Sequence, residues 1–299
     1  MTLVGPSVLG AVMSAFAQAA APGSAPALTK PSTFTLWQLP AQTRTQIMSY
    51  VIRSPGGKLI VLDGGVTGDA RYLKKFVIDQ GAKVEAWFIT HPHSDHVQAF
   101  SAVLADPGPI EIKTIYASLP TEAWVRKYGN DREQATLRTF LESVRAANRT
   151  ATELRLGQEL WIDGVRVEVL GVKNPEIHPN AINNSSLVLR MSDATKSVLF
   201  LGDLGVEGGN KLLASRYRSR LRAEYVQMAH HGQNGVSEAF YRAVNPTYCL
   251  WPTPRWLWDN DKGQGKGTGP WKTLEVRAWM AKLNVQRHYV MADGLHRID

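Results

Sequence analysis

The densest group of side chains that could do chemistry occupies one short run of the chain: His91, Pro92, His93, Ser94, Asp95 and His96. The apolar run before it, 84–90, predicts a buried strand, so the first two histidines can point to one side of an extended segment. Asp95 and His96 fall where the chain turns into a helix and can face a second point nearby. Imidazoles clustered without cations would repel one another on protonation. The run therefore indicates two cations that share one loop, as in two-metal hydrolytic sites.

Two later strand ends carry side chains of the same kind. The apolar run 200–203 ends in Asp203, where a charge is costly unless it is exposed or ligating. The run 229–232 ends another short strand with His230 and His231 at a glycine turn. Taken alone, a strand-end aspartate is more often a turn residue and a histidine pair more often lies on the surface. Beside the first cluster, we favour metal ligation for both.

The elements that must position these side chains alternate along the chain. The β-rich runs on either side of 55–57 (Pro-Gly-Gly) predict a hairpin, and Asp-Gly at 163–164 predicts another. Leu137, Phe140 and Val144 mark the apolar stripe of a helix. Strand and helix signals alternate again in the second half of the chain. Two β-rich halves that each carry helices on the outside predict two packed sheets covered by helices.

These motifs resemble those of the metallo-β-lactamase superfamily, whose hallmark is a His-x-His-x-Asp-His loop. The resemblance covers 35–299, and it implies an α+β four-layer αββα sandwich. The turn at 63–65 (Asp-Gly-Gly) resembles the early strand-end turn of the family. Within the superfamily, the runs 183–189, 200–203 and 230–232 resemble the hydrolase domain of competence-type DNA-uptake proteins and the bacterial phosphocholine esterases.

The resemblance also implies two divalent cations and their ligands. The first cation would be held by His91, His93 and Asp203, and the second by Asp95, His96, His230 and the same Asp203. Many family members hold the first cation with a third histidine, whereas this chain has Asn183 and Asn184 in that region. Three protein ligands and one open position still make a normal catalytic zinc site. We therefore expect Zn²⁺, with Mn²⁺ as the alternative because two carboxylates lie in the cluster.

The reaction expected from this site is hydrolysis by a hydroxide that bridges the two cations, with Asp95 orienting it. His231 and Asn184 are candidates to contact the substrate or to steady the leaving oxygen; the alternative is that they support or pack the site. Trp256 and Trp258 lie in a tryptophan-rich segment and are candidates to stack on the substrate. The alternative is that they pack this segment onto the fold.

The composition and charge of the chain limit which substrates are expected. The chain has 299 residues, of which 44% are hydrophobic, and its single cysteine excludes an intrachain disulfide. The formal charge of +8 favours an anionic small-molecule or oligomeric substrate, nucleic acid among the candidates. We expect hydrolysis of a phosphodiester or another anionic ester. The alternatives are a hydrolase acting on a carbon centre, such as a lactone, amide or thioester, and a metal-binding protein without turnover. The sequence does not specify the oligomeric state.

The N-terminal region has the composition of a targeting segment. It carries no charged side chain before Lys30, and an apolar stretch is followed by Ala-Gln-Ala at 17–19, which is typical of a cleaved secretory signal. Glycine and proline interrupt the apolar stretch, so no stable membrane span is expected. We expect an exported protein, periplasmic or secreted, with a signal peptide at 1–19, a linker at 20–32 and a single hydrolase domain at 33–299.

Overall fold

The computed structural model describes residues 1–2 and 33–299. The signal peptide expected at 1–19 and the linker expected at 20–32 lie outside the described residues, apart from Met1 and Thr2. These two expectations, and export with them, stay predictions. The sheets and helices described below all belong to one unit, Ser32–Asp299. In the part of the chain that is described, none of the helices has the length and apolar character needed to cross a bilayer.

The first sheet contains seven strands, antiparallel at one side and parallel at the other. In spatial order they are β14 (His296–Ile298), β1 (Thr35–Gln38), β2 (Ser49–Arg53), β3 (Leu59–Asp63), β4 (Lys83–Ile89), β5 (Glu111–Ala117) and β6 (Ala151–Glu153). The pairs from β14 to β3 are antiparallel, and those from β3 to β6 are parallel. The β2–β3 hairpin predicted from Pro55-Gly56-Gly57 is confirmed.

The second sheet repeats this plan. Its strands, in spatial order, are β13 (Arg287–Val290), β12 (Tyr248–Trp251), β11 (Tyr225–Gln227), β10 (Ser197–Phe200), β9 (Val188–Ser192), β8 (Val165–Gly171) and β7 (Glu159–Ile162). The strands from β7 to β10 pair antiparallel, and those from β10 to β13 pair parallel. The hairpin predicted at Asp163-Gly164 joins β7 to β8 and is also confirmed.

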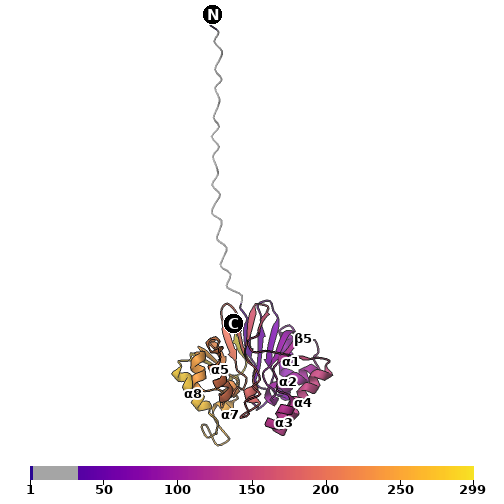
Figure 1. The fold of residues 1–299 in the computed structure, drawn as a ribbon, viewed down its shortest axis with the longest axis vertical. Coiled ribbons are helices and arrows are strands. Elements are labelled where there is room, and N and C mark those ends of the chain that lie inside the picture. Colours follow the sequence, from indigo (N-terminus) through magenta and orange to yellow (C-terminus); the bar gives the residue numbers. More distant parts are fainter. Residues whose placement is uncertain (3–32) are drawn as a thin grey trace. The chain divides into compact units, whose positions relative to one another are not determined.

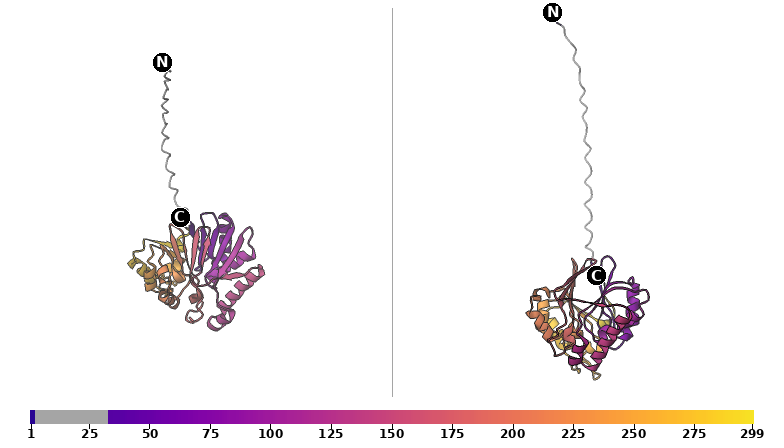
Figure 2. Two further views of the ribbon diagram at one scale, coloured as in Figure 1. Left: turned by 45° about the horizontal axis from the view of Figure 1, so that its top comes forward. Right: turned by 45° about the vertical axis from the view of Figure 1, so that its right-hand side comes forward.

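The helices form an outer layer on each side of the paired sheets. In Figure 1, the purple and magenta helices of the first half lie on one side and the orange and yellow helices of the second half lie on the other. The first group consists of α1 (Ala70–Asp79), α2 (Ser94–Ala105), α3 (Glu122–Tyr128) and α4 (Asp131–Ala146). The second consists of α5 (Val206–Ala214), α6 (Glu238–Val244), α7 (Arg255–Trp258) and α8 (Thr273–Lys282). Figure 2 shows the same layers from two further directions.

The layers follow from strands that are apolar on both faces. In β3, Ile60 and Leu62 point into the core between the sheets, while Leu59 and Val61 point into the core under α1 and α2. Side chains alternate between the faces of a strand, so strands covered on both faces must be apolar throughout. The helices of the second half cover a third apolar cluster on the far side of the other sheet. The expected four-layer αββα sandwich is therefore confirmed.

Candidate metal centre

Four strand ends bring the site together. In the first sheet, β3 ends at Asp63 and the parallel strand β4 leads into His91. In the second sheet, β10 leads into Asp203 and the parallel strand β11 leads into the turn that carries His230 and His231. The carboxyl ends of parallel strands lie at the same edge of a sheet, where α/β proteins commonly build their sites. Side chains more than a hundred residues apart in the sequence therefore meet between the two sheets.

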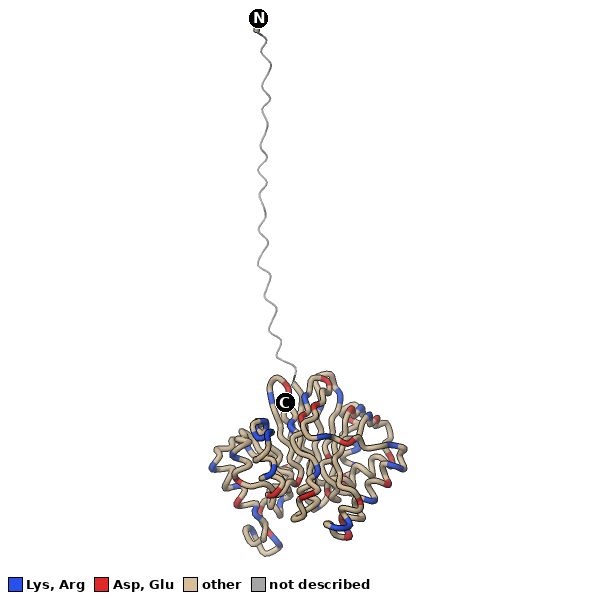
Figure 3. Tube along the Cα trace, viewed as in Figure 1, with Lys and Arg blue, Asp and Glu red and all other residues tan. Residues whose placement is uncertain are grey.

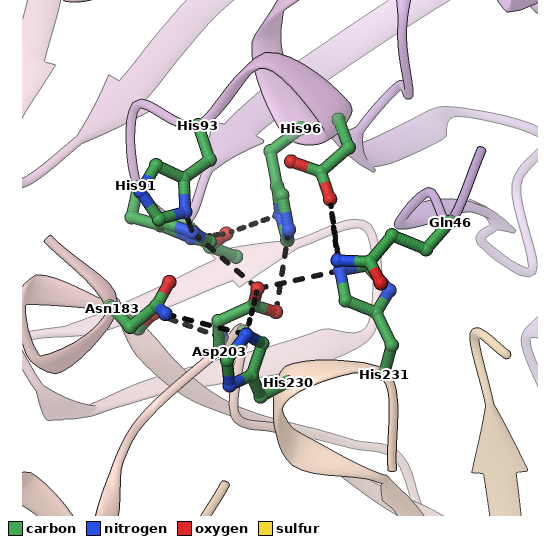
Figure 4. A network of polar contacts seen from close by, with 12 residues as sticks. Gln46, His91, His93, His96, Asn183, Asp203, His230 and His231 are labelled. Atoms are coloured by element: carbon green, nitrogen blue, oxygen red, sulfur yellow. Dashed lines mark hydrogen bonds and ion pairs between the residues drawn. The ribbon is translucent and has the colours of Figure 1, made fainter. Parts of the chain in front are cut away.

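Two buried clusters of possible ligand atoms share this place. In the first, atoms of His91, His96 and Asp203 all lie within 4.8 Å of one another, and in the second the same holds for Asp95, His96 and His231. Asp203 connects the clusters, because its Oδ2 lies 3.8 Å from His91 Nε2 and 3.4 Å from His231 Nε2. Figure 4 shows the Asp203 carboxylate at the centre of the converging imidazoles.

His96 and His231 are each held in place by a contact at one ring nitrogen, which leaves the other nitrogen available to a ligand. His96 Nδ1 lies 2.7 Å from Asp63 Oδ2, and His231 Nδ1 lies 2.9 Å from the carbonyl oxygen of Pro252. Both acceptors favour a proton on Nδ1, which leaves Nε2 as a lone-pair donor. His96 Nε2, His231 Nε2 and Asp203 Oδ1 are buried and find no hydrogen-bond partner among the described residues. Orphaned buried atoms are costly, so this donor set fits a pair of divalent cations.

The buried groups also shift one another's pKa values. Burial lowers the pKa of His96, but the carboxylates of Asp203 and Asp63 outweigh burial and raise it well above its usual value. The same balance, with Asp203 and Asp95 as partners, raises the pKa of His231 to about 9. Burial raises the pKa of Asp203, yet His231 and His96 bring it well below its usual value. Metal ligands must be deprotonated, so cations that bind here would displace protons from the histidines.

His93 lies at the edge of the first cluster, and its neighbour Glu133 was not found from the sequence. His93 Nδ1 is 3.0 Å from His91 Nε2, and its Nε2 is 3.0 Å from Glu133 Oε1. Glu133 belongs to the first turn of α4, where its other oxygen accepts from the backbone N–H of Asn130 in a capping box. The Asn-x-x-Glu spacing could have predicted this helix start. It could not have predicted that the glutamate also reaches His93.

The turn after β11 places His231, and not His230, in the second cluster. Both residues have positive φ angles, 50° and 55°, a region that is strained for side chains other than glycine. His231 is fully buried, and its Nε2 lies 3.2 Å from Asp95 Oδ2. His230 faces the cleft instead, with Nε2 at 4.0 Å from Asp203 Oδ2 and 3.4 Å from Asn183 Nδ2. The sequence suggested the opposite assignment, because it does not show which way two adjacent side chains turn.

The adjacent residues Asn183 and Asn184 also point in different directions. The Asn184 amide nitrogen donates to Glu207 Oε2 at 2.9 Å, and its oxygen accepts from the backbone N–H groups of Gly205 and Gly208. Asn184 is thus fully occupied at the start of α5 and does not face the cleft. Asn183 does face His230, and its buried Oδ1 has no partner among the described residues.

A cleft of about 530 Å³ opens beside the clusters, a size typical of small-molecule sites. Its walls include Asp95, Asp203, His230 and Trp256. Trp258 does not line this cleft. Its ring packs edge-on against the Trp251 ring at 5.1 Å, and the Arg277 guanidinium lies 4.0 Å from its centre. Of the two tryptophans expected near the substrate, the structure therefore brings Trp256 to the cleft and leaves Trp258 in the packing of the fold.

Comparison with known proteins agrees with the fold and the site. Residues 43–230 match the model of the metallo-beta-lactamase superfamily, and the chain belongs to this superfamily. Over 182 residues it is 25% identical to ComE operon protein 3 of Bacillus subtilis (strain 168), a match covering 60% of this chain and 21% of that protein. The chain thus spans about a fifth of the length of this relative. The resemblance to competence-type proteins is confirmed as a distant similarity.

Solved structures share the fold at low sequence identity. The metallo-beta-lactamase fold protein YhfI from Bacillus subtilis aligns with a TM-score of 0.53 and 11% identity, over 89% of this chain and 100% of that one. The Zn²⁺-bound PqqB from Methylobacterium extorquens aligns with a TM-score of 0.51 and 12% identity, again over 89% and 100%. At 11% and 12% identity, these similarities show a shared fold only.

Proposed function

We propose that this chain is a hydrolase that holds two divalent cations in its buried clusters and cleaves a phosphodiester or another anionic ester. The observation that carries the proposal is the position of Asp203. Its Oδ1 lies 3.3 Å from His96 Nε2 and its Oδ2 lies 3.4 Å from His231 Nε2, so the carboxylate lies between the clusters. A carboxylate placed in this way can serve two cations at once.

The ligand assignment follows the placement of the side chains. We assign His91, His93 and Asp203 to the first cation, and Asp95, His96 and His231, again with Asp203, to the second. A donor set of imidazoles and carboxylates suits Zn²⁺, the ion bound to PqqB, and Mn²⁺ is the alternative. When bound, the two cations supply Lewis acidity and lower the pKa of a coordinated water toward neutrality.

Other residues of the chain orient these ligands. Asp63 accepts from His96 Nδ1, and Glu133 accepts from His93 Nε2, so each carboxylate fixes the tautomer and the ring position of one histidine. Gln46 Nε2 donates to Asp95 Oδ2 at 3.1 Å and holds that carboxylate in place. The site is therefore preorganised before a substrate arrives.

The cleft-facing side chains are left to contact the substrate. His230 is partly exposed to the cleft beside Asp203, and the buried Asn183 lies behind it, with its amide nitrogen 3.4 Å from His230 Nε2. Trp256 offers a half-buried ring on the cleft wall. We assign substrate contact to His230 and Trp256, and the positioning of His230 to Asn183. This replaces the assignment of Asn184 and Trp258 suggested by the sequence.

The test is a substrate panel on protein stripped by a chelator and reloaded with Zn²⁺ or Mn²⁺. We expect reloaded protein to cleave bis(p-nitrophenyl) phosphate, and we expect Asp203→Asn to lose turnover by about a thousandfold or more, since it removes the shared ligand. Asp106→Asn, a change at an exposed carboxylate paired with Lys74, is the matched control and should keep full activity.

The outcomes separate the alternatives. Full activity in the Asp203→Asn variant would contradict the site. Turnover of a chromogenic β-lactam or lactone without turnover of the phosphodiester would replace the substrate class by a carbon-centre one. Metal binding without turnover of any substrate in the panel would favour a metal-binding protein without hydrolytic activity.

A further inference from the structure

Two arginines that line the cleft form no ion pair with the described residues. Arg44, in the loop between β1 and β2, and Arg132, in the first turn of α4, line the same cleft as Asp95 and Asp203. Within the described ranges, neither guanidinium lies within ion-pair distance of a carboxylate. Basic and acidic residues are mixed over much of the fold (Figure 3), and some arginines, such as Arg220, pair with glutamates. The two cleft arginines are therefore open to an anion from outside the chain.

Arg132 is held next to the metal clusters. Its Nη2 donates to Ser94 Oγ at 2.9 Å, and Ser94 directly precedes the candidate ligand Asp95. This bond uses one of the five N–H donors of the guanidinium and leaves the others for a ligand. The position is unfavourable for a cation in isolation, because the helix dipole disfavours positive charge in the first turn. A bound anion would offset this cost.

Arg44 is fixed through its backbone. Its carbonyl oxygen accepts from Trp256 Nε1 at 2.9 Å, and two residues later Gln46 donates to Asp95 Oδ2. The loop is thus anchored both to the cleft wall and to the second cluster. Arg44 and Trp256 also line a neighbouring cavity of about 810 Å³, whose other charged walls are Arg255, Asp259 and Asp261, so Arg44 stands where the two cavities adjoin.

We propose that Arg44 and Arg132 form a phosphate subsite, which binds a phosphate group of the substrate other than the one that is cleaved. The inference rests on the proposed hydrolase function and narrows its substrate class to esters with at least two phosphates. Guanidinium groups present several N–H donors in a planar fork that matches phosphate oxygens. The second phosphate is either a terminal monoester or the next linkage of a nucleic acid strand, and both present the same oxygens.

The first test compares three substrates on metal-loaded protein: a dinucleoside monophosphate, the same compound with a terminal 5′-phosphate, and a trinucleotide. We expect an added phosphate to lower KM by about tenfold or more. The Arg44→Gln/Arg132→Gln double variant should lose this preference. Arg138→Gln, on the same helix but outside the cleft, is the matched control and should keep it.

The substrate with the lower KM shows which phosphate the subsite binds. A lower KM with the terminal 5′-phosphate indicates a monoester, and a lower KM with the trinucleotide alone indicates the next linkage of a strand. Either gain supports the subsite if the double variant removes it. The absence of any gain, or a gain that survives in the double variant, overturns it.

The second test does not depend on catalysis. Inorganic pyrophosphate is titrated by calorimetry into chelator-treated protein, so that binding reports the arginines and not the cations. We expect the dissociation constant to rise about tenfold for each arginine replaced and to stay unchanged in Arg138→Gln. Equal binding by wild type and double variant, or no binding by wild type, overturns the subsite. If binding behaves as expected while no phosphodiester is cleaved, the subsite stands and the proposed reaction fails.

Discussion

At the scale of single residues, the site depends on which ring nitrogen of each histidine is free. Asp63 and Pro252 each accept a hydrogen bond at Nδ1, from His96 and His231, and both rings then present Nε2 to Asp203. His93 is turned the other way, with Nε2 bonded to Glu133 and Nδ1 toward His91. Acceptors outside the ligand set thus decide the geometry inside it.

The two adjacent histidines give a direct test of this geometry. We expect His231→Ala to lose about one cation per chain, because His231 is the buried member of the second cluster. We expect His230→Ala to keep both cations and to change turnover through substrate contact. Metal content by mass spectrometry, on protein reloaded with zinc, distinguishes the variants. Two retained cations in His231→Ala, together with a loss in His230→Ala, would reverse the assignment.

Glu133 is expected to act through His93. In Glu133→Gln the side chain can still complete the capping box of α4, but it loses the charge that faces His93. We expect the zinc affinity of the first site to fall about tenfold or more, a common effect of removing such a partner. Competition with a chromogenic chelator measures this affinity. Glu142→Gln, at an exposed position of the same helix, should leave it unchanged, and an equal loss in both variants would argue against a specific role.

At the scale of elements, short turns tie the two sheets together. Asp193, in the turn between β9 and β10 of the second sheet, accepts from the backbone N–H of Phe34 and from Thr33 Oγ1, at the start of β1 in the first sheet. Burial raises the pKa of this carboxyl, but the hydrogen bonds from Thr33 and from backbone N–H groups outweigh it and lower the pKa to about 2. The carboxylate form therefore stabilises the fold.

This carboxylate predicts a dependence of stability on acid. The folded pKa lies below the unfolded value of about 3.9, so the contribution is complete above roughly pH 5 and is lost as the pH falls toward 2. We expect Asp193→Asn to lower the free energy of unfolding at pH 7 by about 1 kcal/mol, because solvent screens this half-exposed group. Urea unfolding across this pH range should show the difference between wild type and variant shrinking toward low pH. A difference that stays constant would count against this account.

At the scale of the whole molecule, neither half of the chain contains the site. His91, His93, Asp95 and His96 come from the first half, and Asp203 and His231 come from the second. Cations bound between the halves would therefore stabilise the complete fold, because a ligand that binds the native state alone shifts the unfolding equilibrium.

Removal of the cations should lower the melting temperature. Each cation present at a hundred times its dissociation constant contributes about 2.7 kcal/mol, so two contribute about 5.4 kcal/mol, which corresponds to a shift of roughly 10–20 °C in a domain of this size. We expect chelator treatment to lower the melting temperature of wild type by this amount and zinc to restore it, whereas Asp203→Asn should respond little. Differential scanning calorimetry gives both values, and an equal zinc response in the two proteins would contradict binding at Asp203.

The sequence alone determined the layers of the fold and most members of the two buried clusters. The apolar strand runs and the dense run from His91 to His96 are local patterns, and a run that is apolar throughout predicts a strand buried on both faces. The early turn at Asp63 and the strand-end carboxylate at Asp203 were likewise visible as residue types at predicted strand ends.

Only the tertiary structure decided which of two neighbours faces inward. His231 rather than His230 enters the second cluster because two consecutive left-handed residues turn the chain, and Asn183 rather than Asn184 faces His230 because the latter caps α5. Glu133 reaches His93 only because α4 packs beside the loop, and Arg44 and Arg132 line one cleft only once both segments are in place. Residue type and spacing carry no information about such orientations, which depend on backbone angles and on contacts between segments distant in the sequence.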